Sequence, residues 1–235
     1  MEEHFKVIIV EHEDNVRQGL IAVFEHHHFY VESVDNAVAG LEKARDGAFD
    51  LLLIDARIAD TDVFQVCADI RSLNPEQVIF MLTADSDNLG LIANQTQSAD
   101  DYTSVPFAYT DLVQRAKALL RRSQLQRKTP SVGKIQLSDD IEIDGANLSG
   151  QCAEGILTFT PREIQVLEYL YKHRGKVVDS HEMLNQVWGY PRYLNTEVRA
   201  VDIHMAILTH KIESDFESPQ YLKRLGEGSY QLLID

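Results

Sequence analysis

The first half of the chain alternates short apolar runs with amphipathic stretches, a pattern that predicts strands alternating with helices. Four consecutive aliphatic residues from Leu51 to Ile54 are too many for a strand with one buried face, and they fit a central parallel strand covered on both sides. The predicted strands span residues 5–10, 29–34, 50–55, 77–82 and 101–105. The predicted helices span residues 14–27, 36–47, 63–73, 86–97 and 110–122. Residues 1–122 are therefore expected to form a doubly wound α/β domain with a five-stranded parallel sheet.

The second half of the chain follows a different pattern. Residues 123–132 are polar, contain a proline and predict a linker between domains. Thr160, Pro161 and Glu163 form a capping-box sequence with proline at the first helical position, which predicts a helix start. Further predicted elements are strands at 135–137, 141–143 and 156–159, a helix that Ser180 caps, a helix at about 197–213, and a hairpin at 221–225 and 230–234. This order predicts an α+β winged helix-turn-helix domain over residues 133–235.

Composition and charge narrow the function classes. The net charge is −15, with 10 Lys/Arg against 21 Asp/Glu in residues 1–122, so nucleic-acid binding must come from a local patch. The two cysteines, Cys67 and Cys152, lack metal-type spacing, and neither a signal peptide nor an apolar run of membrane-spanning length is present. We therefore expect a cytoplasmic protein without membrane partners. No nucleophile–base pair, P-loop or zinc motif favours an enzyme.

Short motifs along nearly the whole chain resemble one family in order and in approximate spacing. Segments of the first half resemble a response-regulator receiver domain: Val7–Asp14, Asp50–Asp55, Met81–Ala84, Ala99–Tyr102 and Pro106-Phe107. Segments of the second half resemble the OmpR/PhoB-type winged-helix domain: Leu157–Glu163, Gln186–Gly189, Arg199–His204 and Tyr230. The joint match is highly specific. The resemblance implies a strand order of 2-1-3-4-5, and a regulator of transcription that binds double-stranded DNA sequence-specifically as a homodimer.

The resemblance also implies a phosphorylation pocket at the carboxyl end of the receiver sheet. Asp55 stands at the position of the phosphoacceptor. Thr83 stands at the position of the switch hydroxyl and Tyr102 at that of the switch aromatic. In the family these groups act together with Mg²⁺, which here would be held by Glu11 and Asp55 if phosphorylation is retained.

Two departures weaken this pocket. The acidic pair that the family places after the first strand is Glu11 and His12 here, and imidazole is a poor ligand for Mg²⁺. The family's lysine before Pro106 is replaced by Val105, which cannot neutralise a phosphoryl oxygen. We therefore expect an atypical regulator that works without phosphorylation and without a bound cofactor.

Two alternatives stay open at this point. In the first, Glu11, Glu13 or Asp14 rescues the metal site, and the protein is an ordinary response regulator that a sensor histidine kinase phosphorylates on Asp55. In the second, the protein has lost DNA binding and acts as an adaptor through protein contacts, because its expected recognition helix is only weakly basic.

The resemblance implies a dimer face on the fourth helix, fifth strand and fifth helix of the receiver. Charged candidates on the strand and the fifth helix are Asp101, Asp111, Arg115 and Lys117. The predicted helix at 86–97 has no charge after Asp87, and its apolar candidates are Leu89, Leu91 and Ile92. An outward apolar patch of this kind suits constitutive dimerisation.

The expected recognition helix divides into two faces at roughly 100° per residue. The face expected to be buried carries Val201, His204, Met205, Leu208 and Ile212. The face expected to meet the major groove carries Arg199, Ile203, Ala206, Ile207 and His210. Arginine can read guanine, and apolar side chains can contact thymine methyl groups. Candidate phosphate contacts are Arg192, Lys223 and Arg224, and the loop before Arg199 is a candidate surface for RNA polymerase.

Overall fold

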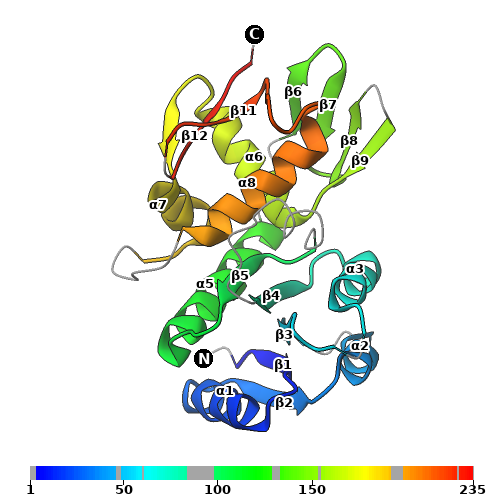
Figure 1. Cartoon of the computed structure of the whole chain (residues 1–235), viewed down its shortest axis with the longest axis vertical. Coiled ribbons are helices and arrows are strands. Elements are labelled where there is room, and N and C mark those ends of the chain that lie inside the picture. Colours follow the sequence, from blue (N-terminus) through cyan, green and yellow to red (C-terminus); the bar gives the residue numbers. More distant parts are fainter. Residues whose placement is uncertain are drawn as a thin grey trace. The chain divides into compact units, whose positions relative to one another are not determined.

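The chain forms two compact units, and the boundary between them in the sequence lies between Ser123 and Gln124. The computed structural model (Figure 1) describes residues 4–45, 49–59, 61–83, 98–128, 133–152, 155–191, 198–226 and 228–234. The predicted helix at 86–97 and the candidate Arg192 lie outside the described residues. None of the described helices has the length and apolar character needed to cross a membrane.

The first unit is built on a five-stranded parallel sheet. Its strands are β1 (Lys6–Val10), β2 (Tyr30–Val34), β3 (Leu51–Asp55), β4 (Val78–Thr83) and β5 (Asp101–Ser104). The spatial order is β2-β1-β3-β4-β5, which confirms the expected topology. Every residue of β3 and β4 is buried, because helices cover both faces of the sheet.

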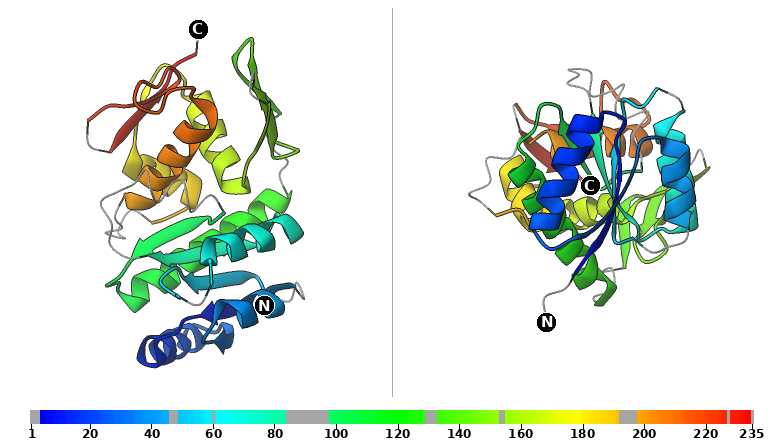
Figure 2. Two further views of the ribbon diagram at one scale, coloured as in Figure 1. Left: turned by 45° about the vertical axis from the view of Figure 1, so that its right-hand side comes forward. Right: turned by 90° about the horizontal axis from the view of Figure 1, so that it is seen from below.

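Helices α1 (Asp14–His26) and α5 (Tyr109–Lys128) lie on one face of this sheet, and α2 (Ala37–Arg45) and α3 (Val63–Leu73) lie on the other (Figure 2). Helix α3 has the predicted bounds, and the carboxylate of Asp62 caps it by accepting hydrogen bonds from two backbone amides. Helix α5 continues through residues 123–128, which were predicted to be linker. Those residues are polar, but Arg, Gln, Leu and Lys favour helices, and Pro130 stands only beyond them.

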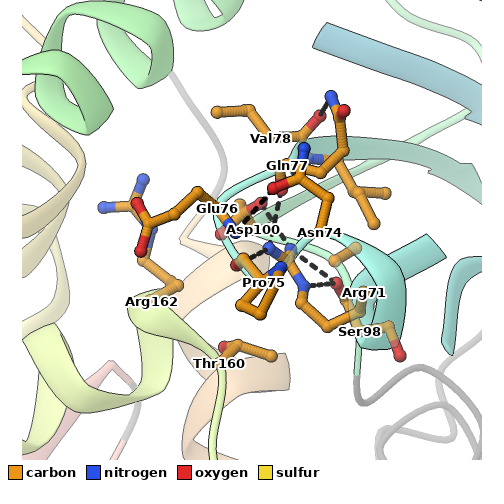
Figure 3. Close-up of polar contacts among 12 residues, drawn as sticks. Arg71, Asn74, Pro75, Glu76, Gln77, Val78, Ser98, Asp100, Thr160 and Arg162 are labelled. Atoms are coloured by element: carbon orange, nitrogen blue, oxygen red, sulfur yellow. Dashed lines mark hydrogen bonds and ion pairs between the residues drawn. The ribbon is translucent and has the colours of Figure 1, made fainter. Parts of the chain in front are cut away.

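One arginine ties the end of α3 to the strands that follow it (Figure 3). The Arg71 guanidinium donates to the carbonyl oxygens of Pro75 at 2.7 Å and Gln77 at 2.6 Å in the turn before β4. It also donates to the carbonyl oxygen of Ser98 at 2.8 Å and to the Asp100 carboxylate at 2.8 Å, just before β5. The side chains of this ion pair are mostly buried, so the bridge fixes the entry of β4 and β5 into the sheet.

The described residues of the second unit form two antiparallel sheets and three helices. The first sheet contains β6 (Lys134–Ser138), β7 (Ile141–Asp144), β8 (Ser149–Cys152) and β9 (Gly155–Thr158) in this order. The helices are α6 (Pro161–Lys172), α7 (Ser180–Met183) with its π-helical extension η1 (Leu184–Trp188), and α8 (Arg199–Ile212). The second sheet has the order β10-β12-β11, with β10 (Val177–Asp179), β11 (Leu222–Arg224) and β12 (Ser229–Leu232). These elements confirm the winged helix, although β8 and β10 were too short and too weakly apolar to be predicted.

Helix starts and a buried tryptophan organise the second unit. The predicted capping box of α6 is present, with Glu163 donating its backbone N–H to the Thr160 hydroxyl and its carboxylate accepting from the Thr160 backbone N–H. The cap of α7 is Asp179 rather than the predicted Ser180. The Asp179 carboxylate accepts hydrogen bonds from the backbone amides of His181 and Glu182 in the first turn. Trp188 is fully buried, with its ring edge-to-face against a histidine of α8 at 5.1 Å between centroids.

Replacing Arg71 by glutamine is expected to destabilise the receiver by about 3 kcal/mol, because Asp100 would remain as a buried carboxylate without its cation. Hydrogen exchange of the Ile79 amide, which donates to Asp100 at 2.8 Å, reports the loss directly. The matched control is Arg45→Gln on the exposed end of α2, which should leave that exchange unchanged. Equal exchange in both variants would contradict the structural role of Arg71.

Candidate functional site

The candidate pocket lies where three neighbouring parallel strands end. Glu11 and His12 follow β1, Asp55 is the last residue of β3, and Thr83 is the last residue of β4. Ligands of doubly wound sheets bind at this carboxyl edge. The side chains of Glu11 and Asp55 are both 0% exposed, and one ligand atom each of Glu11, His12 and Asp55 lies within 4.8 Å of the others. The fold thus gathers these three predicted pocket residues.

Arg57 is the central cation of this pocket, and it was not among the residues predicted from the sequence. Its Nε donates to Asp55 Oδ1 at 3.0 Å and its Nη2 to Asp55 Oδ2 at 2.9 Å, a bidentate bridge. Its backbone N–H also donates to Asp55 Oδ1 at 2.9 Å, in a local turn directly after β3. Its guanidinium nitrogens also lie 3.9 Å from Glu11 Oε2 and 3.4 Å from Glu13 Oε1. A basic residue two positions after a strand-end aspartate is the signal that could have identified it.

Burial and charge set the ionisation of the pocket. Burial raises the pKa of Glu11, the backbone N–H of Glu13 opposes this change, and the nearby Asp55 carboxylate adds to it. Hydrogen bonding to Asp55 raises the pKa of Arg57, so this guanidinium stays charged. His12 Nδ1 lies 3.3 Å from Glu11 Oε1 and 3.4 Å from Asp55 Oδ2. Two buried carboxylates therefore share one permanent cation and one half-exposed imidazole.

This arrangement does not fit Mg²⁺. Magnesium requires oxygen ligands in near-octahedral geometry, and one of the three donors gathered here is an imidazole nitrogen. Both oxygens of Asp55 already accept hydrogen bonds from a guanidinium, whose positive charge would lie against the ion. Glu11 Oε2 is buried and accepts no hydrogen bond within the described part of the chain, but one carboxylate oxygen is not a magnesium site.

The predicted switch residues lie on β4 and β5. The Thr83 hydroxyl donates to the carbonyl oxygen of Thr103 at 3.3 Å. The Tyr102 side chain is buried, and its hydroxyl donates to the carbonyl oxygen of Ala99 at 3.4 Å. Val105 donates its backbone N–H to the carbonyl oxygen of Thr83, and its side chain brings no charge to this edge of the sheet. Both switch groups therefore have partners within the receiver.

The structure describes only part of the candidate dimer face. Leu89, Leu91 and Ile92 lie outside the described residues. Asp101 and Arg115 are buried and paired with each other, with Nε–Oδ2 at 2.9 Å, so each has a partner within the chain. The physical reason is that a buried carboxylate is stable only beside a cation, and α5 supplies one within the chain. Asp111 is exposed, and the Lys117 ammonium lies 6.0 Å from the Phe29 ring centroid.

The recognition face of α8 is also narrower than predicted. Ile203 and Ile207, expected to face outward, are 0% and 1% exposed. The buried residues of this helix are Ala200, Val201, Ile203, His204, Met205, Ile207, Leu208, Thr209 and Ile212. They cover most of its circumference, because α8 carries more apolar side chains than a single face can hold. The partly exposed stripe consists of Arg199, Asp202, Ala206 and His210.

Asp202 links α8 to the terminal hairpin and was not among the predicted residues. Its carboxylate accepts a hydrogen bond from the Tyr230 hydroxyl on β12 and lies 3.6 Å from the Arg224 guanidinium on β11. Burial and this carboxylate raise the pKa of Tyr230, so the hydroxyl keeps its proton. Lys223 is exposed next to Arg224 on the same strand. Arg224 is therefore held beside the partly exposed stripe of α8.

Together, a receiver fold with a strand-end aspartate and a winged helix define a two-domain response regulator. Residues 7–117 match the response regulator receiver domain, and residues 154–232 match the C-terminal domain of transcriptional regulatory proteins. The chain is 30% identical over 211 residues to the response regulator ArlR of Staphylococcus saprophyticus, covering 88% of this chain and 90% of the relative. It belongs to the OmpR/PhoB family of response regulators and is a DNA-binding transcriptional regulator of the two-component type.

Further likenesses extend over the full length. The chain is 28% identical over 232 residues to the alkaline phosphatase synthesis transcriptional regulatory protein PhoP of Bacillus subtilis, covering 97% of this chain and 96% of the relative. Among solved structures, a cysteine-to-serine mutant of RitR matches with a TM-score of 0.66 and 22% identity, covering 97% of this chain and 98% of that one. The second likeness is one of fold alone.

Replacing Asp55 by alanine is expected to destabilise the receiver by about 1–2 kcal/mol, because three hydrogen bonds from Arg57 lose their acceptor and its guanidinium is only partly solvated. Hydrogen exchange of the β3 amides measures the change. Asp69→Ala is the control, since its carboxylate accepts from Gln65 on the helix surface. A gain in stability for Asp55→Ala would instead identify an uncompensated cluster of acids.

Proposed function

We propose that this chain regulates transcription by binding specific DNA sites without phosphorylation of Asp55. The observation that carries the proposal is the state of the Asp55 carboxylate, which is buried and bound through both oxygens by a guanidinium. Phosphoryl transfer requires a free carboxylate oxygen, a divalent cation and a counter-charge for the transferred group. His12 and Val105 remove a metal ligand and the usual ammonium from the same edge of the sheet.

The geometry gives little support to a phosphorylation-dependent receiver with a rescued metal site. Glu13, one candidate for rescue, is paired with Arg57 at 3.4 Å. Asp14, another of the three candidates, is paired with Arg17 at 2.6 Å. Recruiting either carboxylate to a metal would break an existing ion pair. A sensor kinase is therefore not a required partner in this proposal.

The DNA-binding surface proposed here combines α8 with the hairpin. Arg199, Ala206 and His210 form the base-reading stripe, and Lys223 and Arg224 supply phosphate contacts, with Arg192 as a further candidate. Arginine side chains read guanine, whereas lysines beside them neutralise phosphates. The match of the second domain to transcriptional regulators favours this interpretation over an adaptor that has lost DNA binding. Ile203 and Ile207 are not included, because both are buried.

The active form in this proposal is a cytoplasmic homodimer that binds direct-repeat half-sites. Leu89, Leu91 and Ile92 are the proposed apolar seam, with Asp111 and Lys117 at its charged edge. Asp101 and Arg115 support this face from within the chain. The loop before Arg199 is proposed as a contact for RNA polymerase.

The Asp55→Asn variant is expected to bind genomic target fragments with the affinity of the wild type, because Asp55 carries no phosphoryl group in the active form. Titrated gel shifts with and without acetyl phosphate measure this affinity. Circular dichroism of the variant confirms that it is folded. A phosphodonor that tightens binding of the wild type but not of Asp55→Asn would contradict the proposal.

Lys223→Ala is expected to weaken binding to all DNA sequences, because one phosphate contact is lost. The slope of the logarithm of the binding constant against the logarithm of salt concentration should fall in magnitude by about one.

Arg199→Ala is expected to reduce the binding free energy by about 1–3 kcal/mol on the specific site and by little on unrelated DNA. Lys134→Ala is the control, since Lys134 pairs with Glu142 on the first sheet of this domain. Fluorescence-anisotropy titrations across salt concentrations separate the three. Equal losses for all three variants would contradict the proposed interface.

A further inference from the structure

We propose that Arg57 is the resident cation of the receiver pocket, a tethered guanidinium that replaces the divalent ion and makes Asp55 a structural anion. This proposal rests on the proposed function, because it explains how the receiver stays folded, with its pocket carboxylates paired, without phosphorylation. It assigns to Arg57 the role of positioning Asp55, and it predicts that the identity of residue 57 decides whether the pocket binds metal.

The contacts of Arg57 saturate Asp55. The carboxylate accepts two hydrogen bonds from the guanidinium at 2.9 and 3.0 Å and a third from the backbone N–H of the same residue at 2.9 Å. Because the residues are two apart, the turn that brings the backbone N–H to Oδ1 also directs the side chain back over the carboxylate. The planar guanidinium matches the two carboxylate oxygens, which a lysine ammonium cannot do.

The surrounding charges suit one guanidinium. Glu11 and Asp55 are fully buried, and a buried carboxylate without a cation is strongly unfavourable. Arg57 reaches both, at 2.9 Å from Asp55 and 3.9 Å from Glu11, while Glu13 holds its outer nitrogen at 3.4 Å. The side chain is 27% exposed, so part of it meets solvent while its nitrogens reach the buried carboxylates. Among the described residues, these three carboxylates converge on this one arginine.

A metal ion and Arg57 exclude each other in this geometry. A cation bound by Glu11 and Asp55 would lie against the guanidinium and would have to displace it from both oxygens of Asp55. His12 adds a nitrogen donor that favours a zinc-like ion over magnesium. Metal binding therefore requires removal of Arg57, and the choice of metal then depends on His12.

The test is a metal titration of the full chain, followed by the amide resonances of residues 11, 12 and 55. Mg²⁺ and Zn²⁺ are the probes, and the variants are Arg57→Gln, Arg57→Lys and the double variant Arg57→Gln with His12→Asp. Arg57→Gln should gain at least about tenfold in Zn²⁺ affinity over the wild type, and the double variant should gain the same factor for Mg²⁺. The metal affinity of Arg57→Lys should lie between those of the wild type and Arg57→Gln, since lysine keeps the charge but cannot form the bidentate pair. Arg45→Gln, on the exposed end of α2, should behave as the wild type.

Two outcomes overturn the proposal. One is metal binding by the wild type as tight as that of Arg57→Gln at this pocket. The other is a folded Arg57→Gln that gains no affinity for either metal. If Arg57→Gln does not fold, hydrogen exchange of the Arg57 Nε–H is measured in the wild type instead. This exchange should be much slower than that of the Arg45 Nε–H, and it should become faster in Asp55→Asn. Equal exchange at both arginines overturns the proposal. These measurements use no DNA, so they can fail while phosphorylation-independent DNA binding stands, and the reverse holds too.

Discussion

The bidentate bridge between Arg57 and Asp55 is the interaction on which the receiver site depends. The sheet topology buries a carboxylate at the end of β3 and a second one after β1, and their charges must be balanced. A receiver that uses phosphorylation balances such charges with a metal ion and a lysine. Here a single guanidinium lies against both carboxylates, with an imidazole beside them. In the proposed function, this pairing balances the two carboxylates without a metal and separates the chain from a phosphorylated switch.

The second domain also pairs an acidic residue with a basic side chain, at the proposed DNA-binding surface. Helix α8 is buried around most of its circumference, so the proposed base reading uses a narrow stripe that begins at Arg199. Asp202 lies within that stripe, and its carboxylate holds Tyr230 and Arg224 of the hairpin. An acidic residue at the interface is compatible with DNA binding because it orders the basic side chain beside it. In the proposed interface, Arg199, Lys223 and Arg224 are the local basic groups in a chain with a net charge of −15.

Most of the fold could be predicted from hydrophobic periodicity, because fully apolar strands such as β3 and capped helices such as α6 carry strong local signals. Asp55 followed from its place at the end of β3, whereas Glu11, His12, Thr83 and Val105 were implied by the resemblance to response regulators. Arg57 was missed because its role depends on a turn that folds a long side chain back over its neighbour, which no periodicity encodes. Ile203 was expected to face outward and is buried, and the burial of Asp101 was not foreseen, for a similar reason. Their burial depends on packing from other elements, whereas helical spacing and family position describe one element at a time.

The most direct test of the metal-free pocket is titration of the full chain with beryllofluoride and Mg²⁺, a stable mimic of the phosphoryl group, followed by the amide resonances of Asp55, Thr83 and Tyr102. We expect no saturable change at these residues, since both oxygens of Asp55 are bound and Val105 stands in place of the lysine. Saturable, Mg²⁺-dependent shifts at Asp55 and Thr83 would contradict a receiver that works without phosphorylation.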